Sequence, residues 1–127
     1  MSNSKHLVIL NSGVTIWNEW RVSNPVVKPD LKRANLRGVS LREYNLNGAN
    51  LRWAILRDAD LQMTDLSSAD LTHADLRNAN LSNADLNNAN LSKADLRGAD
   101  LSDANITWTL YDRIAMYPKG QKEIKDD

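Results

Sequence analysis

Residues 69–101 read ADLTH-ADLRN-ANLSN-ADLNN-ANLSK-ADLRG-ADL, a run of five-residue repeats of alanine, aspartate or asparagine, leucine and two variable positions. Leucine occupies every fifth position from Leu31 to Leu101, fifteen in succession, and Ile106 takes the sixteenth. Alanine stands two residues earlier in twelve repeats, and Asp or Asn directly precedes the central residue in fourteen. Such fixed-period self-similarity indicates a repeat architecture. The departures are Pro29, Val39, Tyr44 and Thr64 at the alanine position, and Ser40 and Ile55 at the Asp/Asn position.

A period of five residues fits neither a regular helix nor a flat strand. Five helical residues rotate the side chain by ~500°, which would spread the leucines over every face. On a flat strand an odd period places successive leucines on opposite faces. The pattern is satisfied when Ala and Leu point inward from a short extended step, Asp or Asn points outward, and the variable pair turns a corner. Repetition then winds the chain into stacked coils ~4.8 Å apart.

The number of corners in each coil follows from the residues that recur. A triangular coil would repeat every fifteen residues and a square coil every twenty, given the five-residue step. Four arginines recur at a spacing of twenty, which favours the square coil. They are Arg37, Arg57, Arg77 and Arg97.

The tandem A-(D/N)-L-x-x repeats resemble those of the pentapeptide repeat family, from Pro29 to about Trp108, sixteen repeats in all. The resemblance implies an all-β solenoid: a right-handed quadrilateral, four-sided β-helix of about four coils, with stacked Leu and Ala inside. Outward Asp and Asn suit the turns, because their side chains bond readily to nearby backbone groups. The family has diverse functions, so the resemblance implies the fold rather than an activity.

Residues 1–24 are predicted to form an N-terminal capping α-helix of the same domain. An apolar stripe follows helical spacing, and we expect it to cover the open edge of the first coil. A membrane-surface or partner helix is the alternative, disfavoured because the polar face is not markedly basic. The stripe consists of Leu7, Leu10, Val14, Trp17 and Trp20.

Three further features of the cap are predicted. Ser2 or Ser4 caps its start, Gly13 kinks or splits it, and Pro25 ends it because proline restricts the preceding residue. Tyr44 points inward in the first coil by the repeat frame, so its ring is expected to pack against the cap near Trp17 or Trp20.

Residues 29–108 form the predicted β-helix, and residues 109–127 a closing segment with a polar tail. Closure of the last coil is the commoner role of a terminal segment in repeat proteins. If closure is incomplete, an end-to-end homodimer through the C-terminal coil is expected, because an uncovered coil is an exposed strand edge. The chain is otherwise expected to be a monomer, with residues 120–127 frayed.

Two features of the predicted wall are candidates for an interaction surface. Trp53 and Ile55 point outward where the repeat calls for polar residues, which suggests a binding patch. In a square coil Arg33 and His73 stack above and below Trp53. The alternative is that the C-terminal tail folds back over the patch.

The second feature is the arginine column defined above. Arginines at regular spacing could contact phosphates of a nucleic acid. Acidic residues lie beside them, however, so ion pairs worth little energy are expected instead and nucleic acid is disfavoured. These acidic residues are Asp58, Asp75 and Asp95.

Composition bounds the remaining possibilities. The 127 residues make one domain with zero net charge and no cysteine, hence no disulfide, thiol nucleophile or cysteine-ligated metal. No apolar run approaches the ~18 residues of a membrane span. Asn11, Ser12 and Gly13 interrupt the apolar N-terminal stretch, so no secretory pattern is seen and a cytoplasmic bacterial protein is expected.

Catalytic and cofactor motifs are missing from the sequence. The two histidines, His6 and His73, stand far apart, and neither a Gly-rich phosphate loop nor an H-E-x-x-H motif occurs. Asp and Asn alternate down the predicted columns, which disfavours Ca²⁺. No enzyme activity, metal or cofactor is expected.

The predicted function is therefore a non-enzymatic protein–protein interaction module of unidentified partner. One alternative is a DNA mimic acting on a type II topoisomerase such as DNA gyrase, as some pentapeptide repeat proteins do; zero net charge and four coils disfavour it. The other is a structural protein with no specific ligand.

Overall fold

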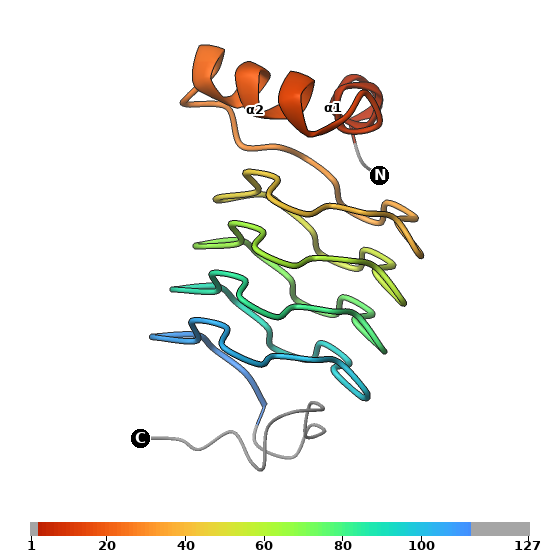
Figure 1. The fold of residues 1–127 in the computed structure, drawn as a ribbon, viewed down its shortest axis with the longest axis vertical. Coiled ribbons are helices and arrows are strands. Elements are labelled where there is room, and N and C mark those ends of the chain that lie inside the picture. The colour runs from red at the N-terminus through yellow and green to blue at the C-terminus, as the bar shows by residue number, and fades with distance from the viewer. Residues whose placement is uncertain (1–2, 113–127) are drawn as a thin grey trace.

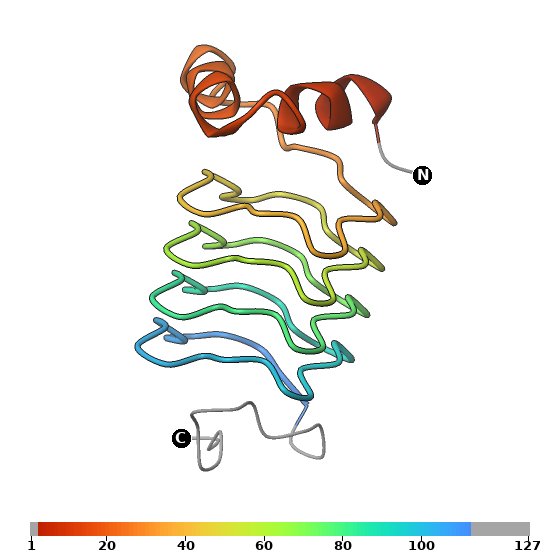
Figure 2. The same ribbon diagram turned by 45° about the vertical axis from the view of Figure 1, so that its right-hand side comes forward.

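The computed structural model describes residues 3–112 and shows two short helices stacked on a column of four coils (Figure 1). Helix α1 spans Ser4–Leu10 and helix α2 spans Val14–Ser23. The second view shows both helices over the same end of the column, with the coils following in chain order beneath them (Figure 2). Neither helix of the described residues is long and apolar enough to cross a membrane.

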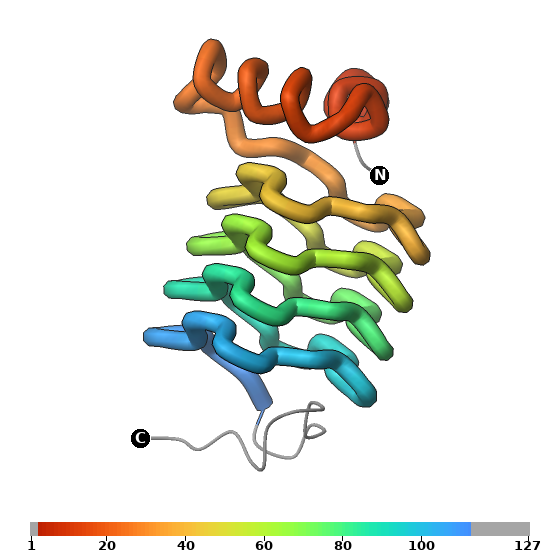
Figure 3. The backbone as a smooth tube through the Cα atoms, viewed as in Figure 1, coloured from red at the N-terminus to blue at the C-terminus, as the bar shows by residue number. Residues whose placement is uncertain are grey.

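The coils repeat every twenty residues. Parallel bridges join residues twenty apart, from Asp30–Asn50 through Asn90–Leu110, and four such bridges fall in each turn of the chain. The predicted four-sided coil is therefore present, and the tube drawing shows its corners in register (Figure 3). Among residues 3–112 these bridges are isolated single residues rather than continuous strands, because two of every five residues are spent on a corner.

Each corner is a four-residue turn closed by a backbone hydrogen bond, as between the N–H of Ala34 and the carbonyl of Leu31 at 3.0 Å. The third residue of every turn has a positive φ: thirteen non-glycine residues and three glycines across the sixteen corners. This geometry defines a type II turn. A left-handed non-glycine residue costs ~1–2 kcal/mol, and bonds between coils offset that cost, as from the Arg33 N–H to the Arg52 carbonyl at 2.9 Å.

The Asp and Asn residues of the repeat bond to the backbone as predicted. All fourteen accept a hydrogen bond at Oδ1 from the N–H two residues later, for example Asp70 from Thr72 and Asn80 from Ser82, both at 3.0 Å. The fifteen leucines fill the interior and are at most 2% exposed. The inward placement of the central residues is confirmed.

The helical cap differs from prediction at its start and is divided where the sequence indicated. Asn3 is the N-cap, accepting from the N–H groups of Lys5 at 2.9 Å and His6 at 3.3 Å. The prediction of Ser2 or Ser4 is therefore wrong: Ser4 already lies in the first helical turn. Gly13 splits the cap into two helices, as the sequence indicated, with φ 104° and ψ 166°, a region open essentially to glycine alone.

The cap docks on the first coil through buried side chains and polar contacts. Leu10 and Trp17 are fully buried, and the other three stripe residues pack partly buried against the same core. The indole Nε1 of Trp17 donates to the Asn45 carbonyl at 2.7 Å. Tyr44 packs with its ring 6.2 Å from that of Trp17 and donates its hydroxyl to the Leu10 carbonyl at 2.9 Å. The predicted packing of Tyr44 against the cap is confirmed.

Arg21 is a docking residue that the sequence did not reveal. It is buried, and its guanidinium donates to the carbonyls of Asn45 at 3.2 Å and Asn47 at 2.9 Å. Burial lowers the pKa of Arg21, and the charge of Asp65 opposes that shift. His6 adds a contact from α1, accepting at Nδ1 from the Asp30 N–H at 2.9 Å.

Candidate interaction face

The twenty-residue register brings all eight predicted surface residues onto one side of the column. This side consists of residues 33–37, 53–57, 73–77 and 93–97, and we call it the Arg–Trp face. The sequence suggested two separate features, and the structure joins them as neighbouring columns of a single wall. The eight residues are Arg33, Trp53, His73, Ile55, Arg37, Arg57, Arg77 and Arg97.

The first corner of the face carries an aromatic column. The rings of Trp53 and His73 stack with centroids 4.0 Å apart and planes 2° apart. The guanidinium carbon of Arg33 lies 5.4 Å from the Trp53 ring centre. Equivalent turn residues share one backbone conformation, so their side chains project in parallel at the coil spacing. The predicted stack is confirmed, and Trp53 remains 44% exposed, presenting its ring edge to solvent.

Ile55 occupies the position between the two corners of the face, in the second of the four coils. It is 38% exposed and bridges Asn35 in the coil above and Asp75 in the coil below. Asn35 and Asp75 each accept from the N–H two residues on, at 3.3 and 3.2 Å. An isoleucine has no acceptor to offer the Arg57 N–H, so this position exchanges a local hydrogen bond for an exposed apolar side chain.

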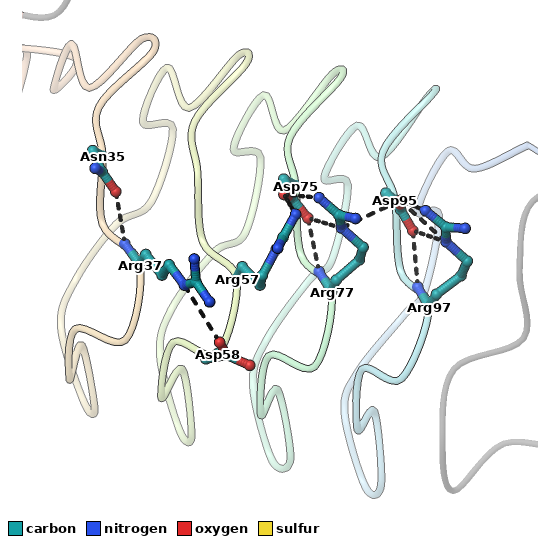
Figure 4. Close-up of polar contacts among 8 residues, drawn as sticks. All are labelled: Asn35, Arg37, Arg57, Asp58, Asp75, Arg77, Asp95 and Arg97. Carbon is teal, nitrogen blue, oxygen red and sulfur yellow. Dashed lines mark hydrogen bonds and ion pairs between the residues drawn. The ribbon is translucent and has the colours of Figure 1, made fainter.

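The second corner carries the arginine column, which is paired as predicted (Figure 4). Asp75 receives Arg57 at 3.3 Å and Arg77 at 2.8 Å. Asp95 receives Arg77 at 3.6 Å and Arg97 at 2.6 Å. The result is a chain of alternating charges with an arginine at each end. Arg37 stands apart from it, 3.6 Å from the half-exposed Asp58.

The ion pairs clearly shift the pKa of one carboxylate on the face. Hydrogen bonds from Arg97 hold the pKa of Asp95 below its ordinary value, against an opposing effect of burial, and the same contact raises the pKa of Arg97. Exposed pairs of this kind contribute little to stability, because solvent screens them. Their main effect is to fix where the charges stand on the face.

The face is basic although the chain is neutral. Six basic residues against two acidic ones leave it a formal charge of +4, while the opposite side, residues 43–47, 63–67, 83–87 and 103–107, carries four acidic residues and no basic one. The zero net charge of the whole chain hides this lateral separation. Sorting the charged residues by position within a twenty-residue period would have found it. The acidic residues of the opposite side are Glu43, Asp65, Asp85 and Asp103.

Other surfaces of the described residues show weaker signs of a binding site. An open hollow of about 570 Å³ lies on α2, lined by Thr15, Asn18, Glu19, Val22 and Ser23. No group of three His, Cys, Asp or Glu residues in the described part of the chain is placed to hold a metal ion. The predictions that the tail covers Trp53, or that residues 109–127 close the last coil, fall mainly on residues 113–127, outside the described residues.

Comparison with known proteins identifies the family. A family model described as pentapeptide repeats matches residues 34–72 and 64–103, more than half of the chain. The chain belongs to the pentapeptide repeat family, as its repeats indicated. A search of curated proteins found none that matches.

Solved structures of pentapeptide repeat proteins are among the matches. A pentapeptide repeat protein of the Arabidopsis thaliana thylakoid lumen is 41% identical with a TM-score of 0.61, over 62% of this chain and 55% of that one. HetL of Nostoc, involved in heterocyst differentiation regulation, is 39% identical with a TM-score of 0.37, over 59% of this chain and 37% of that one. Another Nostoc pentapeptide repeat protein is 31% identical with a TM-score of 0.29, over 84% and 86%. The chain thus spans about half of the Arabidopsis protein and about a third of HetL.

Proposed function

We propose that this chain is a non-enzymatic scaffold that binds a protein partner through the Arg–Trp face. One observation carries the proposal: Trp53 and Ile55, two residues apart in the chain, are both exposed on the face where the basic columns run. Large apolar side chains gathered on a surface and flanked by arginine are the composition of interaction hot spots. The repeat itself calls for polar residues at both positions, so the fold does not account for them.

The ordered backbone suits the proposed role. Coil-to-coil hydrogen bonds fix every corner, so the face is organised before it meets a partner and little conformational entropy is lost on binding. We further propose a right-handed coil, as the family resemblance implies, a cytoplasmic location, and a monomer or an end-to-end dimer through the C-terminal coil.

The two alternatives gain no specific support. A DNA mimic would need rows of negative charge. Here the most highly charged column is the arginine column, and the acidic side carries only four charges. A structural protein without a ligand would not need the departure at Ile55, which removes an acceptor from the turn. The Arg–Trp face therefore remains the surface to test.

The test is a pull-down from a lysate of the source organism, in which the wild type is compared with the double variant Trp53→Ser/Ile55→Asn. Both changes restore polar residues typical of the repeat. The matched control is Met63→Ser, because Met63 takes the same turn position on another side and is also 44% exposed. We expect a partner retained by the wild type and the control and lost by the double variant. Equal capture by all three proteins would refute the assignment of the face.

A further inference from the structure

We infer that the segment bound by the Arg–Trp face is an extended acidic stretch of protein with an apolar residue at its centre, a refinement that rests on the proposed function. The starting point is where the uncompensated positive charge lies. Within residues 3–112, no ion pair reaches the side chains of Arg33 or Lys93, the two ends of the aromatic column. The Asp112 carboxylate accepts from the backbone N–H of Lys93 at 2.8 Å, so Arg33 is the less compensated of the two. Arg37 and Arg97, the two ends of the arginine column, are the most exposed of the paired arginines.

These four cations lie in the first and last coils of the face, at the ends of the aromatic column and of the arginine column. The inner arginines are tied to carboxylates, since Arg57 and Arg77 share Asp75 and Asp95. Trp53 and Ile55 lie in a coil between these outer cations. The face therefore presents an apolar area bounded above and below by exposed positive charge, which is unpaired at Arg33 and Lys93 and shared with a carboxylate at Arg37 and Arg97. A complementary ligand carries negative charge at both ends of an apolar residue.

The spacing defines the ligand further. The outer cations of one column are three coil steps apart, roughly 14 Å at strand spacing. An extended chain advances ~3.4 Å per residue and points every second side chain the same way. Acidic residues four positions apart therefore meet both ends of a column, and an apolar residue midway between them lies within roughly half a coil step of Trp53 and Ile55, which belong to the second of the four coils. The recognised pattern is Asp/Glu-x-apolar-x-Asp/Glu.

Two other occupants fit the face less well. Single-stranded nucleic acid binds by stacking bases on exposed aromatic rings, but both faces of the Trp53 ring are covered, by Arg33 and His73. The chain's own residues 113–127 carry four basic and three acidic residues, so their net charge gives a basic face little to attract. An acidic protein segment suits both the charge and the covered ring.

The test measures fluorescence anisotropy of a labelled peptide containing Asp-Ser-Leu-Ser-Glu, with three comparison probes. These are the peptide with Asn and Gln in place of the acids, the peptide with Ser in place of Leu, and a single-stranded oligothymidine. We expect the amide peptide to bind at least about tenfold more weakly than the acidic one, and added salt to weaken the acidic peptide selectively.

The matched variants are Arg33→Glu/Lys93→Glu on the face and Lys28→Glu/Arg42→Glu away from it, which change the net charge equally. Glutamate is compatible with the turn position of Arg33 and Lys93, because Glu43 already occupies it at φ 64°. We expect the face variant to lose the acidic peptide by about tenfold or more and the control to change it by less than about threefold. Circular dichroism confirms that each variant is folded.

Equal binding of acidic and amide peptides to the wild type would overturn the inference without any variant. Tighter binding of oligothymidine than of the acidic peptide would overturn it in favour of nucleic acid. If the lysate partner depends on Trp53 and Ile55 but no acidic peptide binds, the proposed function stands and the acidic motif fails. If neither a partner nor the peptide is held by the face, both fail.

Discussion

Tyr44 offers a test in which the repeat consensus and the structure predict opposite results. Alanine is the residue of twelve repeats at this position, so consensus reasoning expects Tyr44→Ala to be neutral or stabilising. The structure places the Tyr44 ring 6% exposed beneath the cap, beside Trp17, with its hydroxyl on the Leu10 carbonyl. We therefore expect the substitution to destabilise the junction between α1, α2 and the first coil.

The magnitude follows from two separable losses. Truncating a buried aromatic ring to alanine costs ~3–5 kcal/mol through lost contacts and the cavity left behind. The hydrogen bond contributes ~0.5–1.5 kcal/mol, toward the lower end here because the Gly13 N–H also donates to the Leu10 carbonyl at 3.4 Å. Tyr44→Phe isolates this smaller loss. Val39→Ala is the comparison for a change to the consensus alanine. The Val39 side chain is partly buried and has no polar group, so this change is expected to cost about 1 kcal/mol.

Urea unfolding followed by circular dichroism at the helical band measures the effect, because the helices of the described residues all lie in the cap. A loss of ~3 kcal/mol moves the midpoint by about 1 M or more at typical slopes. Because repeat proteins unfold unit by unit, we expect the helical signal to be lost before the coils. A Tyr44→Ala midpoint equal to that of the wild type would refute the docking of the cap through this ring.

Two further predictions concern the backbone and pH. Gly98→Ala is expected to lower the thermal midpoint, because a non-glycine residue at φ +74° costs ~1–2 kcal/mol; the Asn78 Oδ1 that would lie 2.1 Å from the new Cβ ends a side chain that can turn away, and an unchanged midpoint in calorimetry would contradict the turn geometry. Burial lowers the pKa of His6, with Asp30 opposing the shift, and its Nδ1 must stay unprotonated to accept the Asp30 N–H. Stability is therefore expected to be full above the unfolded pKa of ~6.5 and to fall as pH drops below it, with a flat midpoint between pH ~6.5 and ~5 in His6→Asn; a wild type equally flat there would remove His6 as the cause.

The repeat made most of the column predictable, and the cap much less so. Period and register were enough to place Trp53 between Arg33 and His73, because every coil copies the last. Arg21 and Asn3 had no such signal. Their roles depend on how two helices seat on the first coil, a tertiary relation that no periodicity encodes. The lateral charge separation lay within reach of the sequence, because the predicted four-sided coil already assigns each charged residue to a side.

The same backbone explains why function and fold separate so cleanly in this chain. Sixteen left-handed corners are held by bonds between coils rather than by the identity of the corner residue, since Arg, Trp, His and Asn all adopt that conformation. Corner side chains can therefore change at little cost to the fold, and Trp53 alone would be weak evidence of a site. Ile55 differs, because the Asp/Asn position contributes a hydrogen bond in all fourteen repeats that keep it. Isoleucine at this position loses the hydrogen bond and exposes an apolar side chain, and neither change stabilises the fold. Binding of a partner would explain the residue.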